Sequence, residues 1–277
     1  MEPSARRFIA LICLAVVFVG CEKNPSPTTP SAPTEGTATS LTISGADWLR
    51  TGQSQAYTAT VNLSDGTTRQ VSSAVWTSDN PSVLGITSAG VAQGLTQGSA
   101  TITATALSVS GTHAVRVWQD YQGTWSGSYR ASVCQLRGGF PGGPLCDTTF
   151  SPGSLLPISI ALTQNAESAS GSLALGGFVN ALSGSIVDSG RFVGAASGGI
   201  FSNAGLTIRT TVSTLDVMST ATDLNGALIF TITYDGTPGD LYVEADLSGV
   251  TRTASAARLE KHSSQLSWPA ILRDRGR

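Results

Sequence analysis

Apolar and polar residues alternate along most of the chain, in short segments separated by glycine, proline, asparagine and aspartate. In residues 57–63 the odd positions are apolar and the even positions are polar, and residues 100–105 alternate between apolar residues and threonine. This period of two is typical of strands with one buried face. Several short strands around a large aromatic residue, Trp76, predict a β-sandwich over residues 38–118.

Residues 119–260 show the same alternation in about eight further segments. Short turns such as Asp235-Gly236 join them, which favours an antiparallel meander. Closing eight strands into a barrel would remove the exposed sheet edges, and a barrel of this size is filled by its own side chains or holds one small ligand. We therefore expect an all-β chain whose second domain is a small barrel, with a second β-sandwich or a partly open barrel as alternatives. The expected strands are 121–129, 156–164, 168–176, 180–188, 190–197, 204–215, 225–234 and 240–252.

The first 20 residues have the pattern of an export signal. Two arginines precede an apolar run from Phe8 to Val19, which is too short to span a bilayer, and Cys21 follows Gly20. The segment resembles a bacterial lipoprotein signal. That resemblance implies cleavage before Cys21, lipid on its thiol, and anchoring to the cell envelope, expected at the outer membrane on its periplasmic or exposed face. The alternative is an ordinary secretory signal followed by a chance cysteine.

Both ends of the exported chain have compositions that do not favour a packed core. Residues 21–37 follow the predicted signal with prolines among serine and threonine, which favours an extended tether. Residues 261–277 are short and basic, and we expect them to be disordered. The formal net charge is -2, and no cluster of lysine and arginine offers a surface for nucleic acid.

Cysteine usage agrees with export. Cys13 falls in the predicted signal and Cys21 is expected to carry lipid, so Cys134 and Cys146 remain as a pair. In an oxidising compartment we expect this pair to form a disulfide that closes a short loop. The alternative is two reduced cysteines. A metal role is less favoured because no histidine lies near either of them in the sequence.

Five motifs follow one another in the first domain. Together they resemble the bacterial immunoglobulin-like domain of group 2, known from intimin- and invasin-type surface proteins, across residues 38–118. The matched residues are turn formers and core residues, so the resemblance brings no catalytic site. It implies an immunoglobulin-like β-sandwich that serves as a spacer, an adhesive arm or a glycan contact in a surface or periplasmic protein. The motifs are LTI at 41–43, DGT at 65–67, WTSDNPSV at 76–83, GVAQG at 90–94 and GSATITA at 98–104.

The second domain opens with Gly123-Thr124-Trp125, and Arg252 lies in its last expected strand. This arrangement is similar to the lipocalin-type barrel, in which a tryptophan near the first strand packs against a late arginine. The resemblance covers only these two short sites. It implies that Trp125 and Arg252 are a barrel-closing pair.

A glycine-rich loop between the first two long strands contains the cysteine pair, with Phe140 at its tip. Such a loop would be a lid over the barrel mouth or a contact for a partner, and the alternative is an insertion that binds nothing. We take Trp125, Tyr129 and Phe140 as the candidate contacts for an envelope glycan, a small apolar ligand or a surface protein.

No combination of residues points to catalysis, a cofactor or a metal. Of the two histidines, His113 lies in the first domain and His262 in the predicted tail, and we expect His113 on a strand surface. The common serine-hydrolase motifs are absent. Glu244 and Asp246 share a strand face and would permit carboxylate-dependent hydrolysis, although solvent exposure is the simpler interpretation. Asp235 and Asp240 would permit calcium binding, but aspartate beside glycine is first a turn former.

These observations predict a non-enzymatic, lipid-anchored envelope protein in which the immunoglobulin-like domain presents a second β-domain for binding. A purely structural or adhesive surface spacer is the first alternative, and a carboxylate-dependent hydrolase is the second. A hollow barrel would favour a ligand carrier, whereas a filled interior would favour surface adhesion.

Overall fold

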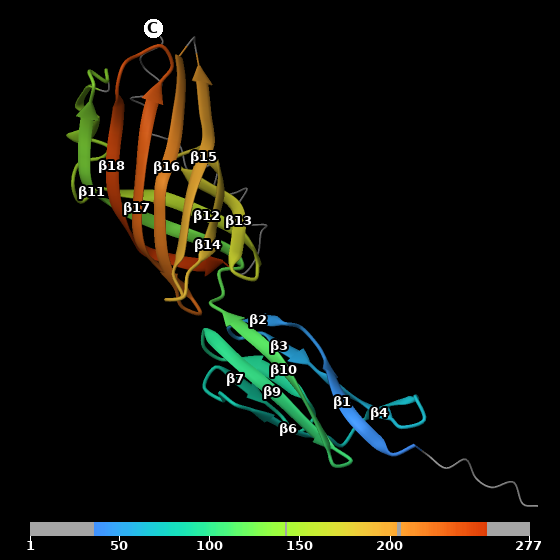
Figure 1. The fold of residues 1–277 in the computed structure, drawn as a ribbon. Coiled ribbons are helices and arrows are strands. Elements are labelled where there is room, and N and C mark those ends of the chain that lie inside the picture. The colour runs from blue at the N-terminus through green and yellow to red at the C-terminus, as the bar shows by residue number, and fades with distance from the viewer. Residues whose placement is uncertain (1–35, 142, 204–205, 254–277) are drawn as a thin grey trace, which may run out of the picture. The chain divides into compact units, whose positions relative to one another are not determined.

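The computed structural model describes residues 36–141, 143–203 and 206–253, which form two β-domains (Figure 1). Within these ranges the regular elements are strands and one short 3₁₀ turn, η1 (Gly143–Cys146). The predicted all-β fold class is confirmed. None of the described segments is a helix long and apolar enough to cross a membrane. The predicted signal at 1–20, Cys21 and the predicted tail at 261–277 lie outside the described residues.

The first domain has ten strands in three sheets. One sheet has the order β1-β4-β5, a second β2-β10-β9-β6 and a third β3-β8-β7. Strand β2 pairs with β10 in parallel, whereas β9 and β10 form a long antiparallel hairpin. The strands are β1 (Ala38–Ser44), β2 (Trp48–Arg50), β3 (Ser54–Ala56), β4 (Thr58–Leu63), β5 (Thr68–Val71), β6 (Val75–Ser78), β7 (Leu84–Ile86), β8 (Val91–Gly94), β9 (Gly98–Ala106) and β10 (Val109–Trp118).

The core aromatic residue of the first domain is Tyr57 rather than Trp76. Tyr57 is buried and donates a hydrogen bond of 2.7 Å from its hydroxyl to the carbonyl of Ala46, whereas Trp76 is only partly buried. Trp76 lies on β6, an edge strand of its sheet, which accounts for its partial exposure. The Trp76 ring lies against Gly90. A side chain there would place its Cβ 2.9 Å from the indole, and the backbone φ of +75° also favours glycine. The sandwich prediction holds, but its central side chain was wrongly chosen.

The second domain is a closed barrel of eight antiparallel strands, in the order in which they occur along the chain (Figure 1). Strand β11 closes the barrel by pairing with both β12 and β18. The predicted antiparallel barrel is therefore confirmed, and the sandwich and open-barrel alternatives are excluded. The strands are β11 (Gly123–Arg137), β12 (Leu155–Asn165), β13 (Ser168–Leu175), β14 (Phe178–Ile186), β15 (Phe192–Asn203), β16 (Leu206–Ser219), β17 (Asp223–Tyr234) and β18 (Asp240–Thr253).

The first barrel strand is longer than its sequence pattern predicts. The alternation predicts a strand over 121–129, but β11 continues to Arg137 and pairs with β18 along this extension. Two register shifts, between Ser126 and Ser128 and between Ala131 and Val133, interrupt the period of two. Because such bulges place two residues opposite one, the continuing strand has no simple alternating pattern in the sequence.

The barrel interior is filled by one continuous cluster of apolar side chains from all eight strands. Aromatic rings run through it. Tyr121 contacts Phe192 with ring centroids 5.6 Å apart, and Tyr129 contacts Phe230 at 5.8 Å. Each of these four side chains has 0% exposure, so the middle of the barrel is packed as a core.

Candidate functional site

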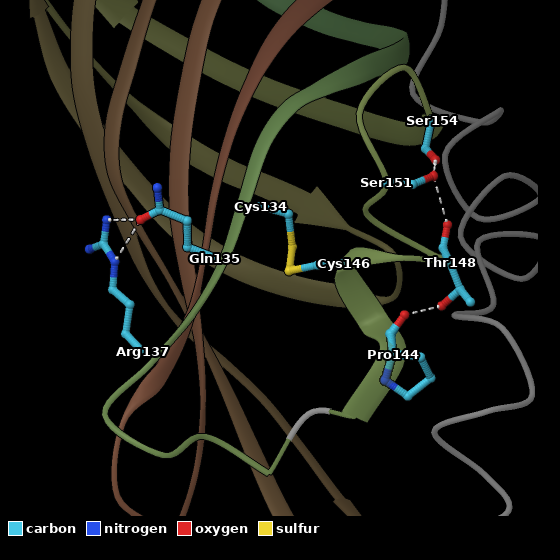
Figure 2. Close-up of a disulfide and its surroundings, with 8 residues drawn as sticks. All are labelled: Cys134, Gln135, Arg137, Pro144, Cys146, Thr148, Ser151 and Ser154. Carbon is cyan, nitrogen blue, oxygen red and sulfur yellow. Dashed lines mark hydrogen bonds between the residues drawn. A yellow bond between two sulfur atoms is a disulfide. The ribbon is translucent and has the colours of Figure 1, made fainter.

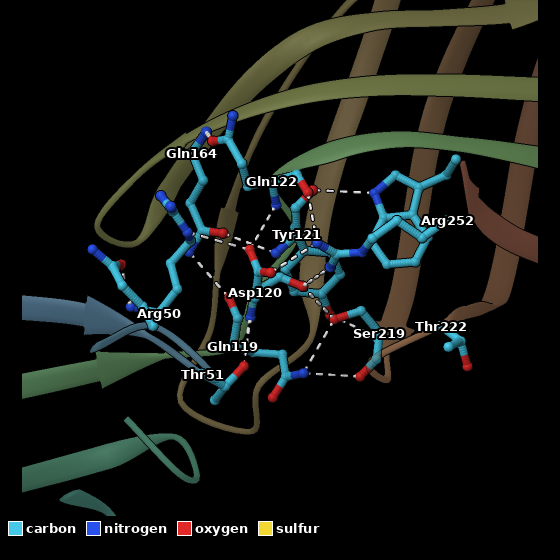
Figure 3. A network of polar contacts seen from close by, with 12 residues as sticks. Arg50, Thr51, Gln119, Asp120, Tyr121, Gln122, Gln164, Ser219, Thr222 and Arg252 are labelled. Carbon is cyan, nitrogen blue, oxygen red and sulfur yellow. Dashed lines mark hydrogen bonds and ion pairs between the residues drawn. The ribbon is translucent and has the colours of Figure 1, made fainter. Parts of the chain in front are cut away.

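The end of the barrel at which β11 begins and β18 ends is closed by an aromatic and polar cluster (Figure 3). Trp125 lies opposite Arg252 in the β11–β18 ladder, and the Arg252 guanidinium lies 4.3 Å from the centroid of the Trp125 ring. The Trp125 indole donates a hydrogen bond of 3.1 Å to the carbonyl of Tyr121. We call Tyr121, Trp125 and Arg252 the closed end. The two residues singled out by the lipocalin-like pattern are in direct contact there.

Tyr121 is the centre of this closed end, and sequence reasoning did not single it out. Its hydroxyl lies 2.8 Å from the carbonyls of Gly190 and Val217, and it accepts hydrogen bonds from the backbone amides of Phe192 and Ser219. One buried phenol thus joins backbone groups of β15, β16 and the turn before β15. Burial raises the pKa of Tyr121, so the hydroxyl is neutral and stays a hydrogen-bond donor.

Asp120 holds Arg252 in place. Arg252 Nη1 donates 2.8 Å to Asp120 Oδ2 and 2.9 Å to the carbonyl of Gln122, and Nη2 donates 3.1 Å to the carbonyl of Asp120. Arg50 Nε lies 3.4 Å from the other oxygen of the same carboxylate. Because Asp120 lies just before the strand, outside any alternating pattern, the sequence offered no periodic signal for it.

A pocket of about 670 Å³ opens beside this network, lined by Arg50, Gln97, Gln119 and Arg252 among others. Its polar side chains already bond within the protein. Gln97 donates to the carbonyls of residues 187 and 188, Gln119 donates to Ser219, and both arginines face Asp120. The side chains that line the pocket therefore bond mainly to other parts of the protein, and few of their polar groups are left to bind a ligand.

The opposite end of the barrel is filled by the segment between β11 and β12. Phe140, Leu145 and Phe150 of this segment are all buried within the barrel core. The Phe140 ring centroid lies 4.6 Å from that of Tyr234, and the Phe150 centroid lies 5.9 Å from that of Phe230. We call these three loop residues the plug. Apolar residues five positions apart in an otherwise polar, glycine-rich loop are the signal that would have identified Leu145 and Phe150.

The predicted disulfide is present, and it ties this segment to the barrel wall. Cys134 and Cys146 are bonded, which joins β11 to η1 (Figure 2). One detail of the prediction is wrong: the cysteines do not both lie in the loop, because β11 extends past Cys134. The bond therefore crosslinks a barrel strand to the plug segment rather than closing a loop on itself.

The three candidate contact residues are all buried. Trp125 and Tyr129 have 0% exposure and Phe140 has 5%, so none of them is offered to a partner at the surface in this conformation. Trp125 belongs to the closed end, Phe140 to the plug, and Tyr129 lies between them on β11. The structure thus brings them into one core rather than around an open mouth.

Tyr129 differs from Tyr121, the buried phenol at the closed end of the barrel. Its hydroxyl is buried and has no hydrogen-bond partner, whereas the hydroxyl of Tyr121 has four polar neighbours. Burial raises the pKa of Tyr129, so the group is a neutral donor. A buried polar group without a partner destabilises the folded state and requires an explanation.

Three of the carboxylates considered for catalysis or calcium, Glu244, Asp246 and Asp235, have structural partners or lie in solvent. Glu244 accepts a hydrogen bond of 2.8 Å from Tyr242, which raises the pKa of Tyr242, and Asp246 is exposed on the outer face of β18. Asp235 is held in a two-point contact by Arg209, at 2.7 and 2.8 Å. Among the described residues no group of three or more histidine, cysteine, aspartate or glutamate side chains is arranged to hold a metal ion.

His113 was expected on a strand surface, and it is partly buried instead. Its Nε2 lies 3.3 Å from both the Ala46 carbonyl and Asp47 Oδ1, and its ring lies 5.6 Å from that of Tyr57. This places His113 against the tyrosine core of the first domain, where its contacts are structural.

Comparison with protein families identifies the first domain. Residues 37–117 match the family model of the bacterial Ig-like domain (group 2), which confirms the resemblance seen in the five motifs. Domains of this group are a non-catalytic kind of fold found in surface proteins. No curated protein sequence matches the chain.

Among solved structures the chain is similar to parts of the S-layer protein SbsC. Domains 4 and 5 of that protein match with 12% identity over 75% of this chain and 97% of that one, at a TM-score of 0.28. Domains 5–6 match with 16% identity over 76% and 97%, also at 0.28. TM-scores of this size do not establish a shared fold.

Proposed function

We propose that this chain is a non-enzymatic protein of the bacterial cell envelope, exported by residues 1–20 and anchored by lipid on Cys21. Two findings support export. The immunoglobulin-like domain at 37–117 is of a kind used in surface proteins, and the disulfide between Cys134 and Cys146 suits an oxidising compartment. The position of Cys21 directly after the apolar run supports anchoring.

Within this proposal the immunoglobulin-like domain presents the barrel, and the barrel contacts an envelope glycan or a surface protein through its outer face. The observation that carries this choice is the filled interior. Because aromatic side chains of the protein itself occupy the middle of the barrel, the outer surface is the part available to a partner. A rigid adhesive or spacer element without a specific ligand is the second candidate, favoured by the same packing.

Anchoring is tested by expressing the full chain in a bacterial host grown with an alkyne fatty acid. Wild-type protein is expected to carry the label and to sediment with membranes, and Cys21→Ala is expected to lose both properties. Cys13→Ala is the matched control, because this cysteine lies in the predicted signal and its loss leaves the label in place. Unlabelled wild-type protein in the soluble fraction would contradict anchoring.

Recognition is tested separately with disulfide-bonded chain that begins after Cys21. Binding to whole bacterial cells, isolated peptidoglycan and lipopolysaccharide is measured at increasing protein concentration. Saturable binding to one of these supports recognition through the outer face. A folded chain that binds none of them favours the spacer.

A further inference from the structure

We propose that Phe140, Leu145 and Phe150 form a displaceable plug over a latent ligand site inside the barrel. The site would take an elongated apolar molecule with one hydrogen-bond acceptor, such as a fatty acyl chain that ends in a carboxyl or ester oxygen. In the described conformation the plug occupies the place of that ligand. The site lies inside the barrel, so it does not depend on the proposed recognition through the outer face.

The plug residues fill barrel space that the strands themselves leave. Phe150 packs edge-on against Phe230 of β17, and Phe140 packs against Tyr234 at the end of the same strand. All three plug residues belong to the single core cluster of the barrel. If they moved out, the space left would be lined by apolar and aromatic side chains, and apolar cavities of this kind bind apolar molecules.

The plug segment is joined to the barrel wall by backbone bonds at its two ends and by the disulfide at Cys146, beside Leu145. At its start, the Phe140 amide donates a hydrogen bond to the Arg137 carbonyl at the end of β11. At its end, residues 153–154 form backbone hydrogen bonds with Ala131 of β11. The Phe150 amide bonds within the plug segment, to the carbonyl of Leu145. The closed order of barrel strands does not include residues 138–154, so the strand ladders would stay in place if the plug moved. The disulfide would keep a displaced plug tethered to β11.

The unpartnered hydroxyl of Tyr129 supplies the polar contact. It is fully buried beside Phe230, the residue that also contacts Phe150. A core tyrosine without a partner is less stable than a phenylalanine at the same place, so its hydroxyl is explained if it bonds in another state of the protein. As a neutral donor, it would bond a carbonyl or carboxylate oxygen of a bound ligand.

The first test measures binding of two fluorescent probes, cis-parinaric acid, which ends in a carboxylate, and diphenylhexatriene, which has no acceptor. Phe140→Ala combined with Phe150→Ala removes the plug rings. This variant is expected to bind parinaric acid with one site per chain and at least about tenfold more tightly than wild type. Leu136→Ala combined with Leu155→Ala removes exposed side chains near the roots of the plug, and is expected to match wild type.

Adding Tyr129→Phe to the plug variant tests the polar contact. Affinity for parinaric acid is expected to fall about tenfold, as for one hydrogen bond lost to a charged group. Affinity for diphenylhexatriene is expected to stay the same. An equal loss for both probes would show that Tyr129 acts only through packing.

The proposal is overturned if the folded plug variant binds parinaric acid no better than wild type, or binds it without a defined stoichiometry. Folding of the variant is checked by cooperative melting and by formation of the Cys134–Cys146 bond. If the variant does not fold, native-state hydrogen exchange on wild type decides. The amide of Phe150 is expected to exchange at least about tenfold faster than that of Ile160 in β12. Exchange of both only by global unfolding would refute a displaceable plug.

Discussion

The two ends of the barrel are sealed by different kinds of chemistry. At the closed end, Tyr121 bonds to backbone groups of β15 and β16, Trp125 and Arg252 bond to carbonyls of residues 120–122, and Asp120 fixes the guanidinium. At the plugged end, the seal consists of apolar loop side chains and one disulfide. Both ends bury large aromatic rings, and they differ in the kind of contact that holds them closed.

This difference indicates which end can rearrange. Opening the closed end would break a connected set of hydrogen bonds that joins the segment before β11 to β15, β16 and β18, and would leave buried groups without partners. Opening the plugged end would expose apolar side chains to water but would leave the strand ladders intact. The closed end is therefore expected to unfold with the barrel, and the plugged end to open before it.

Trp125→Ala is expected to give the largest effect, because it removes a fully buried ring that both Arg252 and Tyr121 contact. The loss in free energy of unfolding is expected to be about 3–5 kcal/mol, measured by chemical denaturation. Phe201→Ala is the control, since this ring is 42% exposed and its loss is expected to have an effect below about 1 kcal/mol. Equal effects for the two variants would contradict the assigned role of the closed end.

Removing the disulfide by Cys134→Ala combined with Cys146→Ala is expected to give the next largest loss in free energy of unfolding. The bond spans 12 residues, and its loss is expected to cost about 3 kcal/mol through the larger entropy of the unfolded chain. Amide exchange is expected to increase at Phe150 before it increases at Tyr121. A uniform increase over both ends would show that the bond stabilises the whole barrel rather than the plug.

Two tyrosine-to-phenylalanine changes compare the ends directly. Tyr121→Phe removes a hydroxyl with several partners and is expected to destabilise the protein by about 1–2 kcal/mol. Tyr129→Phe removes a hydroxyl without a partner and is expected to leave stability unchanged or to raise it by about 1 kcal/mol. Denaturant midpoints of the two variants measure the difference. A destabilised Tyr129→Phe protein would mean that this hydroxyl has a partner in solution, such as a buried water molecule.

The smallest effect on stability is expected from lowering the pH, which acts on the exposed ion pair of Arg209 and Asp235 at the plugged end. The hydrogen bonds from Arg209 lower the pKa of Asp235 below its ordinary value of 3.8. Since the folded state then binds the proton less well than the unfolded state, this pair stabilises the fold above that value and loses its effect as pH falls through the lowered pKa. Asp235→Asn is expected to make the free energy of unfolding depend less on pH on the acid side. The change is expected to be small, because the pair is exposed and its interaction is screened by solvent. An unchanged profile would show that the pair contributes nothing.

Alternation predicted most of the fold because each strand has one face in a core. The strands from β12 to β18 lie close to the predicted segments, and the five motifs identified the first domain. The prediction failed where alternation is interrupted: β11 continues past two bulges to Arg137, and Trp76 lies on an edge strand. A bulge or an edge depends on the partner strand, which a local pattern does not contain.

The sequence by itself determined the all-β class, the family of the first domain, the pairing of Cys134 with Cys146, and the two residues of the Trp125–Arg252 contact. Only the tertiary structure decided that Phe140 points into the barrel, that Tyr121 and Asp120 hold the closed end, and that the Tyr129 hydroxyl has no partner. The physical reason is the separation along the chain over which each effect acts. Periodicity and turn chemistry act between neighbours in the chain, whereas the filling of a barrel and the satisfaction of a buried hydroxyl depend on residues many positions apart.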